Sequence, residues 1–215
     1  MKTHIIMKSR AIALTAIMIL GSISFTQAQE MAAQTADIKG EGQSAAEYRL
    51  KDNAYSIQIK GTSNVHDWTM KAEKMEGVAT VDWGQQGPAD FNKVHITVQA
   101  KTLESGKRIM NNKSHDALKV EQYPAITFEL ISVSELQSNG KKFSGKATGT
   151  MKIAGESSIM TVPFQGKILD KDTFRVEGNF SLKMKEFGIK PPKAMLGTLK
   201  TGNEVTLSYQ MTFNQ

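Results

Sequence analysis

The stretch 142–155 constrains the fold of this chain more than any other, because its residues alternate strictly. One side carries apolar or small residues, and the other carries lysine, serine and threonine. A period of two over this length predicts a strand with one dry and one wet face. The dry face is unusual, because Gly145, Ala147 and Gly149 occupy its centre, where core strands usually carry larger residues. These small residues leave room for either a neighbouring side chain or a ligand.

The same period recurs along most of the chain. It predicts long strands at 55–60, 93–100, 125–136, 159–168, 173–183 and 204–213, with shorter ones at 48–50, 68–74 and 77–83. Ser-Asn-Gly at 138–140 predicts a hairpin turn into the opening strand. Pro163 predicts that its strand is an edge, bulged or irregular.

Only the stretch 105–120 loses this period in favour of a helical one, and Pro124 prevents a helix from continuing. The pattern predicts an all-β fold of about eight antiparallel strands with a short helical segment. Such sheets close into a barrel or stack as a sandwich, and the length of the strands favours the barrel. Residues 47–215 are predicted to form this one domain.

The N-terminus has the features of a cleavable export signal spanning 1–28. Basic residues precede the uncharged run 11–25, and Thr26-Gln27-Ala28 provides small residues for cleavage after Ala28. The alternative is a membrane anchor, but the run is shorter than the roughly 20 residues that a spanning helix needs. Residues 29–46 have no periodicity and are predicted to be a flexible leader.

Charge and cysteine content exclude some classes of protein. Removing the signal removes Lys2, Lys8 and Arg10, which lowers the formal charge from +6 to +3. A mildly basic domain does not indicate nucleic-acid binding. The chain has no cysteine, so its stability must come from packing and strand pairing.

Four motifs in order resemble the YceI-like family of exported, lipocalin-like barrels. Gln-Tyr-Pro-Ala-Ile-Thr-Phe at 122–128 is similar to the Tyr/Phe-Pro-x-Ile-x-Phe element of that family. The others are the strand end at 149–155, the Ser-x-x-His-x-Trp-like segment at 61–68 and the late loop at 190–197. The segment 107–118 departs from the Arg-Asp-x-His-Leu type helix of many members.

The resemblance implies a periplasmic protein that binds a polyisoprenoid, such as a quinone or polyprenyl lipid, or a similar long amphiphile. It implies no catalysis and no cofactor. Alternation predicts the inward columns that would line the lumen: Tyr55, Ile57, Ile96, Val98, Ile126, Phe128, Ala147, Met151, Phe164, Val176, Phe180 and Leu207. The alternative is a solid-core barrel, with large side chains over the small ones, that is structural or binds a partner in envelope stress.

Two His-Asp pairs, His66-Asp67 and His115-Asp116, raise the possibility of a metal or catalytic site. With three histidines after the signal and no cysteine, we expect neither. His66 and Asp67 are instead predicted to fix a loop, with Trp68 plugging the barrel, and His115 is predicted to be exposed. No serine has a nucleophile-elbow context, so the sequence does not favour a hydrolase. The resemblance to the family implies a binding protein and not an enzyme.

A basic segment near the C-terminus includes Lys190 and Lys193, interspersed with the apolar residues Phe187, Ile189, Met195 and Leu196. A basic loop with apolar tips is suited to transient contact with an anionic membrane. The alternative is a solvated loop that closes the barrel.

Overall fold

The computed structural model describes residues 45–194 and 198–215. The predicted signal and nearly all of the predicted leader lie outside these residues. The elements are β1 (Ala46–Ser63), β2 (Trp68–Ala72), β3 (Met75–Gly84), β4 (Gly87–Gln99), η1 (Ala100–Thr102), β5 (Leu103–Glu104), α2 (Arg108–Leu118), β6 (Ala125–Asn139), β7 (Lys142–Ile153), β8 (Glu156–Asp170), β9 (Thr173–Lys183), η2 (Met184–Phe187), β10 (Lys193–Ala194) and β11 (Leu199–Asn214).

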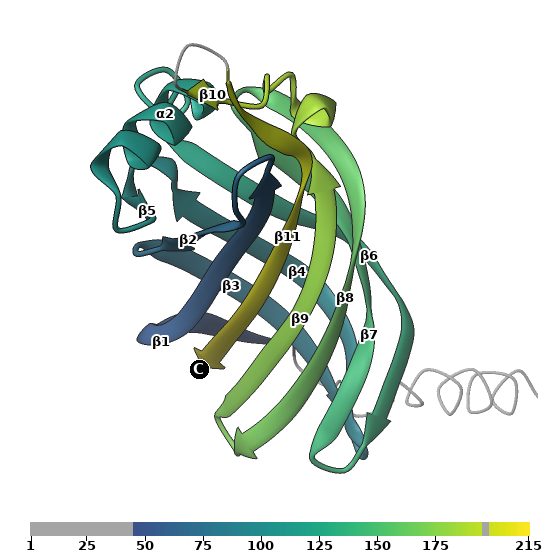
Figure 1. Cartoon of the computed structure of the whole chain (residues 1–215). Coiled ribbons are helices and arrows are strands. Elements are labelled where there is room, and N and C mark those ends of the chain that lie inside the picture. The colour runs from purple at the N-terminus through teal and green to yellow at the C-terminus, as the bar shows by residue number, and fades with distance from the viewer. Residues whose placement is uncertain (1–44, 195–197) are drawn as a thin grey trace, which may run out of the picture. The chain divides into compact units, whose positions relative to one another are not determined.

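Eight long strands form a closed antiparallel barrel in the order β1-β3-β4-β6-β7-β8-β9-β11, with β11 pairing back to β1. Helix α2 and the short strands β5 and β10 lie at one end of the barrel (Figure 1). The hairpin turns between β6 and β7 and between β8 and β9 lie at the other end (Figure 1). The all-β barrel and the single short helix predicted from the sequence are therefore confirmed.

The strand at 142–153 alternates as predicted. Phe143, Met151 and Ile153 are buried, whereas Lys142, Lys146 and Lys152 are exposed. Strand β7 pairs along its whole length with β6 and β8, so neither of its edges is free. The turn predicted at 138–140 is also present, with Gly140 at a φ of 60°.

Two predicted strand boundaries are wrong. The strands expected at 48–50 and 55–60 are one strand, β1, because Asn53 adopts a φ of 56° and forms a bulge in place of a turn. Strand β11 begins at Leu199 and not at the predicted 204, because Ser63 pairs with Thr201 across the sheet. Both differences arise from cross-strand pairing that local composition does not encode.

Strand β8 has a free edge along its first half, as Pro163 predicts. Its pairing with β9 covers only Gln165–Asp170, and its earlier residues pair only with β7. The hydroxyl of Tyr209 in β11 donates a hydrogen bond to the carbonyl of Pro163 at 2.8 Å. Tyr209 lies opposite Gly178 of β9, so its side chain links β11 to β8 across the intervening strand. This link holds the wall together where the backbone ladder ends.

The core has two clusters with different chemistry. The cluster near the hairpin turns is aromatic, with neighbouring ring centroids 5.0–6.3 Å apart, and comprises Tyr48, Trp83, Phe91, Phe143, Phe164, Phe174 and Phe213. The cluster at the helix end is mostly aliphatic and comprises Met151, Ile153, Ala154, Leu182, Met184, Phe187, Ile189 and Val205. In the part of the chain that the structure describes, no helix is long and apolar enough to cross a membrane.

Candidate ligand-binding lumen and its basic mouth

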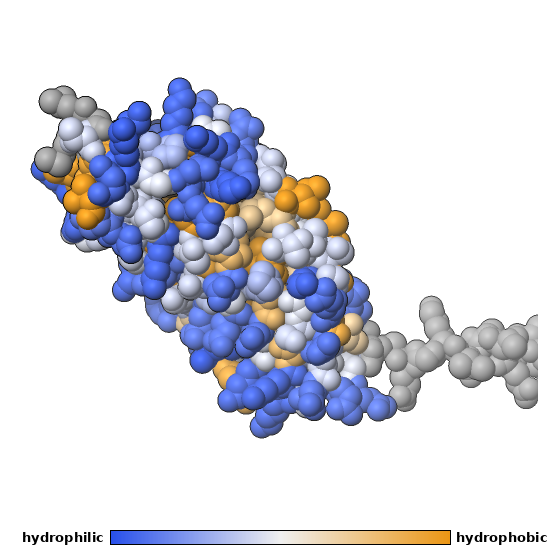
Figure 2. All heavy atoms as spheres, turned by 45° about the vertical axis from the view of Figure 1, so that its right-hand side comes forward, coloured by the Kyte–Doolittle hydropathy of each residue, from blue (hydrophilic) through white to orange (hydrophobic). Residues whose placement is uncertain are grey.

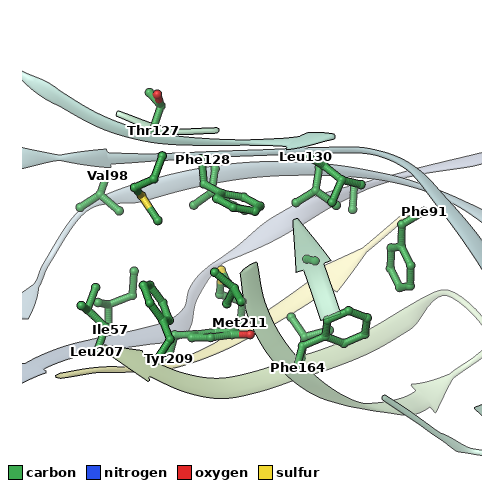
Figure 3. A pocket seen from close by; sticks show the side chains of 18 of the residues that line it. Ile57, Phe91, Val98, Thr127, Phe128, Leu130, Phe164, Leu207, Tyr209 and Met211 are labelled. Atoms are coloured by element: carbon green, nitrogen blue, oxygen red, sulfur yellow. The ribbon is translucent and has the colours of Figure 1, made fainter. Parts of the chain in front are cut away.

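The barrel encloses a lumen cavity of about 150 Å³. Its lining comes from all eight barrel strands and includes no charged side chain. Among the lining residues only Thr127 and Tyr209 carry polar side-chain atoms, and the Tyr209 hydroxyl is already bonded to Pro163. Figure 3 shows Phe128 and Leu130 of β6 facing Leu207, Tyr209 and Met211 of β11 across the space. A dry space of this composition suits a hydrocarbon segment and not a polar group.

Eleven of the twelve residues predicted from alternation line this cavity: Ile57, Ile96, Val98, Ile126, Phe128, Ala147, Met151, Phe164, Val176, Phe180 and Leu207. Tyr55 does not. Its hydroxyl donates to the carbonyl of Glu73 at 3.3 Å and lies 3.4 Å from the amide nitrogen of Met75. Tyr55 is thereby tied to the connection between β2 and β3, away from the lumen.

The small residues of β7 do not all open the lumen. A Cβ atom on Gly145 would lie 2.8 Å from Cζ of Phe164, and one on Gly149 would meet the Phe128 ring and the carbonyl oxygen of Glu129. The aromatic rings of the neighbouring strands therefore occupy the room that these two glycines leave. Only Ala147, between them, lines the cavity. The solid-core alternative is thus correct at the glycines and incorrect at Ala147.

A larger pocket of about 630 Å³ lies at the helix end of the barrel, and we call it the mouth. Ile126, Met151 and Leu207 line both the mouth and the lumen cavity. These three side chains are therefore the boundary between the two spaces. The rest of its apolar wall includes Met70, Met110, Leu118, Leu182, Met184 and Val205.

Helix α2 forms one wall of the mouth, and a buried amide fixes its position. The Oδ1 atom of Asn111 accepts hydrogen bonds from the amide and hydroxyl of Ser105, at 2.9 and 2.6 Å. Its Nδ2 atom donates to the carboxylate of Glu104 at the end of β5. Lys119 ends the helix in the left-handed conformation, with its amide bonded to the carbonyl of Asp116 at 3.1 Å. The first turn of the helix is thus held to the end of β5, and its last turn is capped by its own backbone.

The rim of the mouth is basic. The ionisable side chains that line it are His66, Lys107, Arg108, Lys113 and Lys193, and no aspartate or glutamate lines it. Ile109, which also lines the mouth, is 72% exposed. The mouth therefore combines an apolar interior with a rim of cations.

The histidines have mainly structural contacts. The hydroxyl of Ser63 accepts from the His66 amide at 3.1 Å and donates to the His66 carbonyl at 2.7 Å, so Ser63 holds this loop. The His66 ring contributes one contact, with Nδ1 2.9 Å from the carbonyl oxygen of Asp67. Trp68 packs against both clusters at the mouth, and its Nε1 atom donates to the carbonyl of Thr62 at 3.1 Å. The prediction that His115 is exposed is wrong, because it is half-buried with Nε2 3.0 Å from the carbonyl oxygen of Leu103. Within residues 45–194 and 198–215, no three histidine or carboxylate side chains are grouped to hold a metal.

The basic C-terminal segment is only partly as predicted. Phe187 and Ile189 are buried in the aliphatic cluster, so they are not exposed apolar tips. Met195 and Leu196 lie outside the described residues. Lys190 is exposed but does not line the mouth, whereas Lys193 does. The apolar residues exposed near the cations are Ile109 and Val65, at 72% and 66%.

Sequence reasoning missed most of the mouth. Lys107, Arg108 and Lys113 belong to the segment that departs from the pattern of the resembling family, and their role in the mouth was not foreseen. The available signal was the helical spacing of Met110, Ala117 and Leu118, which places an apolar stripe on α2 beside these cations.

Comparison with known proteins shows the family of the chain. A family model described as the YceI-like domain matches residues 48–213. The chain belongs to the YceI-like family. A UPF0312 protein of Pseudomonas paraeruginosa is 32% identical to it over 185 residues, covering 81% of this chain and 86% of the relative. A Pseudomonas aeruginosa UPF0312 protein is 31% identical over the same length.

Solved structures of YceI-like proteins share the fold. A polyisoprenoid binding domain from Saccharophagus degradans superimposes with a TM-score of 0.62 at 11% identity, covering 80% of this chain and 99% of that domain. BcnA of Burkholderia cenocepacia gives 0.60 at 15% identity, covering 76% of this chain and 98% of BcnA. At these identities the similarity establishes the barrel and leaves the ligand of this YceI-like chain to be argued from its own residues.

Proposed function

We propose that this YceI-like chain is an exported carrier that holds a long apolar amphiphile, such as a polyisoprenoid, with its tail in the lumen. The observation that carries the proposal is the uncharged lumen cavity of about 150 Å³, which adjoins the mouth of about 630 Å³. Ile126, Met151 and Leu207 lie between the two spaces. The mouth lies within the range of about 300–1,000 Å³ typical of small-molecule sites. The Saccharophagus degradans domain described as polyisoprenoid-binding supports this choice of ligand through its fold.

The energetics need no polar recognition motif in the lumen. Each buried methylene contributes about 0.8 kcal/mol, so an isoprene unit contributes roughly 3–4 kcal/mol before association costs. A few buried units then suffice for micromolar binding. The boundary includes Met151, whose flexible side chain can move without a large change in packing. A tail longer than the lumen cavity would extend through this boundary into the mouth.

Native purification followed by solvent extraction and mass spectrometry tests the carrier proposal. We expect a stoichiometric lipid, or uptake of a prenyl quinone by the delipidated protein. Absence of both would contradict the proposal. Fractionation of the source cells, with N-terminal sequencing of the mature chain, tests export: we expect a periplasmic protein that begins at Gln29.

Ala147→Phe is the variant that separates binding from folding. It fills the lumen at the small lining residue that is not already covered by a ring, so we expect at least about tenfold weaker uptake, equal to about 1.4 kcal/mol. Ser134→Phe places the same side chain at an exposed position of β6 and is the matched control. Both variants should retain the circular dichroism of the barrel. Equal uptake by the two would show that ligand does not enter the lumen.

A second candidate is a barrel without cargo that binds a partner in the envelope stress response. The rings covering Gly145 and Gly149 favour it, because they fill part of the lumen. Co-purification of a stoichiometric protein with a lipid-free barrel would support this candidate over the carrier.

Transient membrane contact through the segment of Lys190 and Lys193 belongs to the same proposal. Both lysines are exposed at the helix end, where a lipid would enter or leave. Lys190→Glu with Lys193→Glu should weaken sedimentation with anionic vesicles, whereas Lys141→Glu with Lys142→Glu at the opposite end should not. Unchanged sedimentation of the first variant would exclude this contact.

A further inference from the structure

The mouth carries positive charge that the lumen lacks, and a purely apolar ligand would not interact with that charge. The lumen lining has no charged residue, whereas the mouth is lined by Lys107, Arg108, Lys113 and Lys193 without a carboxylate among its lining residues. Each of the four is exposed, so keeping it charged costs little. Their convergence on an otherwise apolar pocket is what requires explanation.

None of these four cations forms an ion pair within the described part of the chain. The ion pairs there involve other residues, such as Lys101 with Glu121 and Lys146 with Glu135. The carboxylates nearest to these cations in the sequence do not line the mouth. Glu104 accepts a hydrogen bond from Asn111, while Asp67 and Asp116 are exposed and do not line the mouth. The positive charge of the mouth is therefore not neutralised by its own side chains.

The backbone adds to this positive charge. Lys107 is the N-cap of α2 and makes no side-chain capping bond, and the first turn carries no acidic residue. Cations at a helix N-terminus are unfavourable, because they meet the positive end of the helix dipole. An anion held in the mouth would relieve this repulsion while its tail remained in contact with Met110, Leu118 and Met151.

We infer that the mouth binds the anionic headgroup of an amphiphile, of the phosphate class, through Lys107, Arg108, Lys113 and Lys193. This inference rests on the proposed carrier function and specifies the ligand further: an apolar tail in the lumen and an oxyanion at the rim. Arg108 provides a planar donor fork suited to phosphate oxygens, and the lysines provide point charges. The tail gives most of the affinity, and the rim selects among headgroups.

Three ligands with one tail and different heads test the inference. Farnesyl phosphate, farnesol and farnesylamine are titrated by calorimetry into the delipidated protein, below the concentration at which they aggregate. Exposed ion pairs contribute about 1.4- to 5-fold each, so four cations together should favour the phosphate over the alcohol by at least about fourfold at low salt. The amine should bind most weakly. The preference should shrink at about 1 M salt, where the screening length is about 3 Å.

The variant K107Q/R108Q/K113Q/K193Q should lose the preference and bind the phosphate and the alcohol with equal affinity. The matched control K51Q/K141Q/K142Q/K167Q removes four exposed cations outside the mouth and should keep the preference. Wild-type protein that binds farnesol and farnesyl phosphate equally would overturn the headgroup inference and leave the carrier function standing. Binding of none of the three would contradict the carrier function itself.

Inorganic phosphate separates a lipid headgroup from a free ion. At the concentrations used for farnesyl phosphate, we expect no heat from inorganic phosphate and no competition with the lipid. Binding of inorganic phosphate as strong as that of farnesyl phosphate would overturn the assignment of the site to an amphiphile.

Discussion

The two ends of the barrel are built from different side chains for different purposes. At the hairpin end, Phe174 is 1% exposed and its ring lies 5.0–6.3 Å from those of Tyr48, Trp83, Phe91 and Phe143, with Phe213 stacked at 5.3 Å. At the helix end, four methionines line a pocket of about 630 Å³: Met70, Met110, Met151 and Met184. One end is packed shut, and the other is hollow.

This difference divides stability from binding. Edge-to-face and stacked rings fill space with few rotatable bonds, so the aromatic end specifies one packing. Methionine has three rotatable bonds and adapts to irregular shapes, which suits the mouth to the passage of the proposed ligand. Figure 2 shows apolar groups emerging between polar ones on the face formed around β6 to β9, so the wall between the two ends is not uniformly polar. Because rings fill the hairpin end, the proposed ligand is expected to enter from the helix end.

The largest effect is expected when a residue of the aromatic end is substituted, because that end contributes most to stability. Phe174→Ala should lower the free energy of unfolding by about 3–5 kcal/mol, because the residue is fully buried among rings. Ile109→Ala at the exposed rim of the mouth should change it by less than about 0.5 kcal/mol. Urea unfolding followed by circular dichroism measures both. Similar losses in the two variants would show that the two ends contribute alike.

The two glycines of β7 test how tightly the rings of the neighbouring strands pack against the barrel wall. Gly149→Ala should cost about 1–3 kcal/mol, because its Cβ would meet the backbone carbonyl of Glu129 as well as the Phe128 ring. Gly145→Ala meets chiefly the tip of Phe164, so adding Phe164→Leu should recover most of its loss. Adding Phe128→Leu to Gly149→Ala should recover little, since the carbonyl remains. Equal recovery in the two pairs, measured by thermal unfolding, would contradict this packing.

The smallest effect concerns the link across the unpaired half of β8. Tyr209→Phe removes the hydrogen bond to Pro163 and should cost about 1 kcal/mol. Burial raises the pKa of the Tyr209 hydroxyl above its usual value of about 10, so the unfolded chain ionises first as the pH rises. Stability should therefore be fully present below about pH 10 and fall above it, and the fall should be smaller in Tyr209→Phe. Urea midpoints measured at several pH values test this, and an identical pH dependence in the two proteins would disprove it.

Alternation was sufficient to predict the barrel and most of the lumen. Each of Ile57, Val98 and Met151 follows from a period of two, because a closed sheet has one inner face. Tyr55 was misplaced, since a hydroxyl bonded to the backbone near Glu73 holds its side chain away from the lumen. Periodicity describes which face a residue occupies and not what the tip of a long side chain reaches.

The mouth was beyond sequence reasoning for a different reason. His66, Arg108 and Lys193 are far apart in the chain and meet only when the barrel closes and α2 packs across its end. The room at Gly145 and Gly149 was likewise ambiguous, because whether a ring fills it depends on the register with β6 and β8. Both features depend on pairing between distant segments, which no local pattern specifies.

The most direct test of the account is the position of a bound lipid relative to the two tryptophans. Trp68 lines the mouth, and Trp83 belongs to the aromatic cluster at the closed end. In the single-tryptophan variants Trp83→Phe and Trp68→Phe, a farnesyl lipid carrying a nitroxide at its head should quench Trp68 strongly and Trp83 little. Stronger quenching of Trp83, or no quenching of either, would contradict a carrier that takes the tail into the lumen and keeps the head at the mouth.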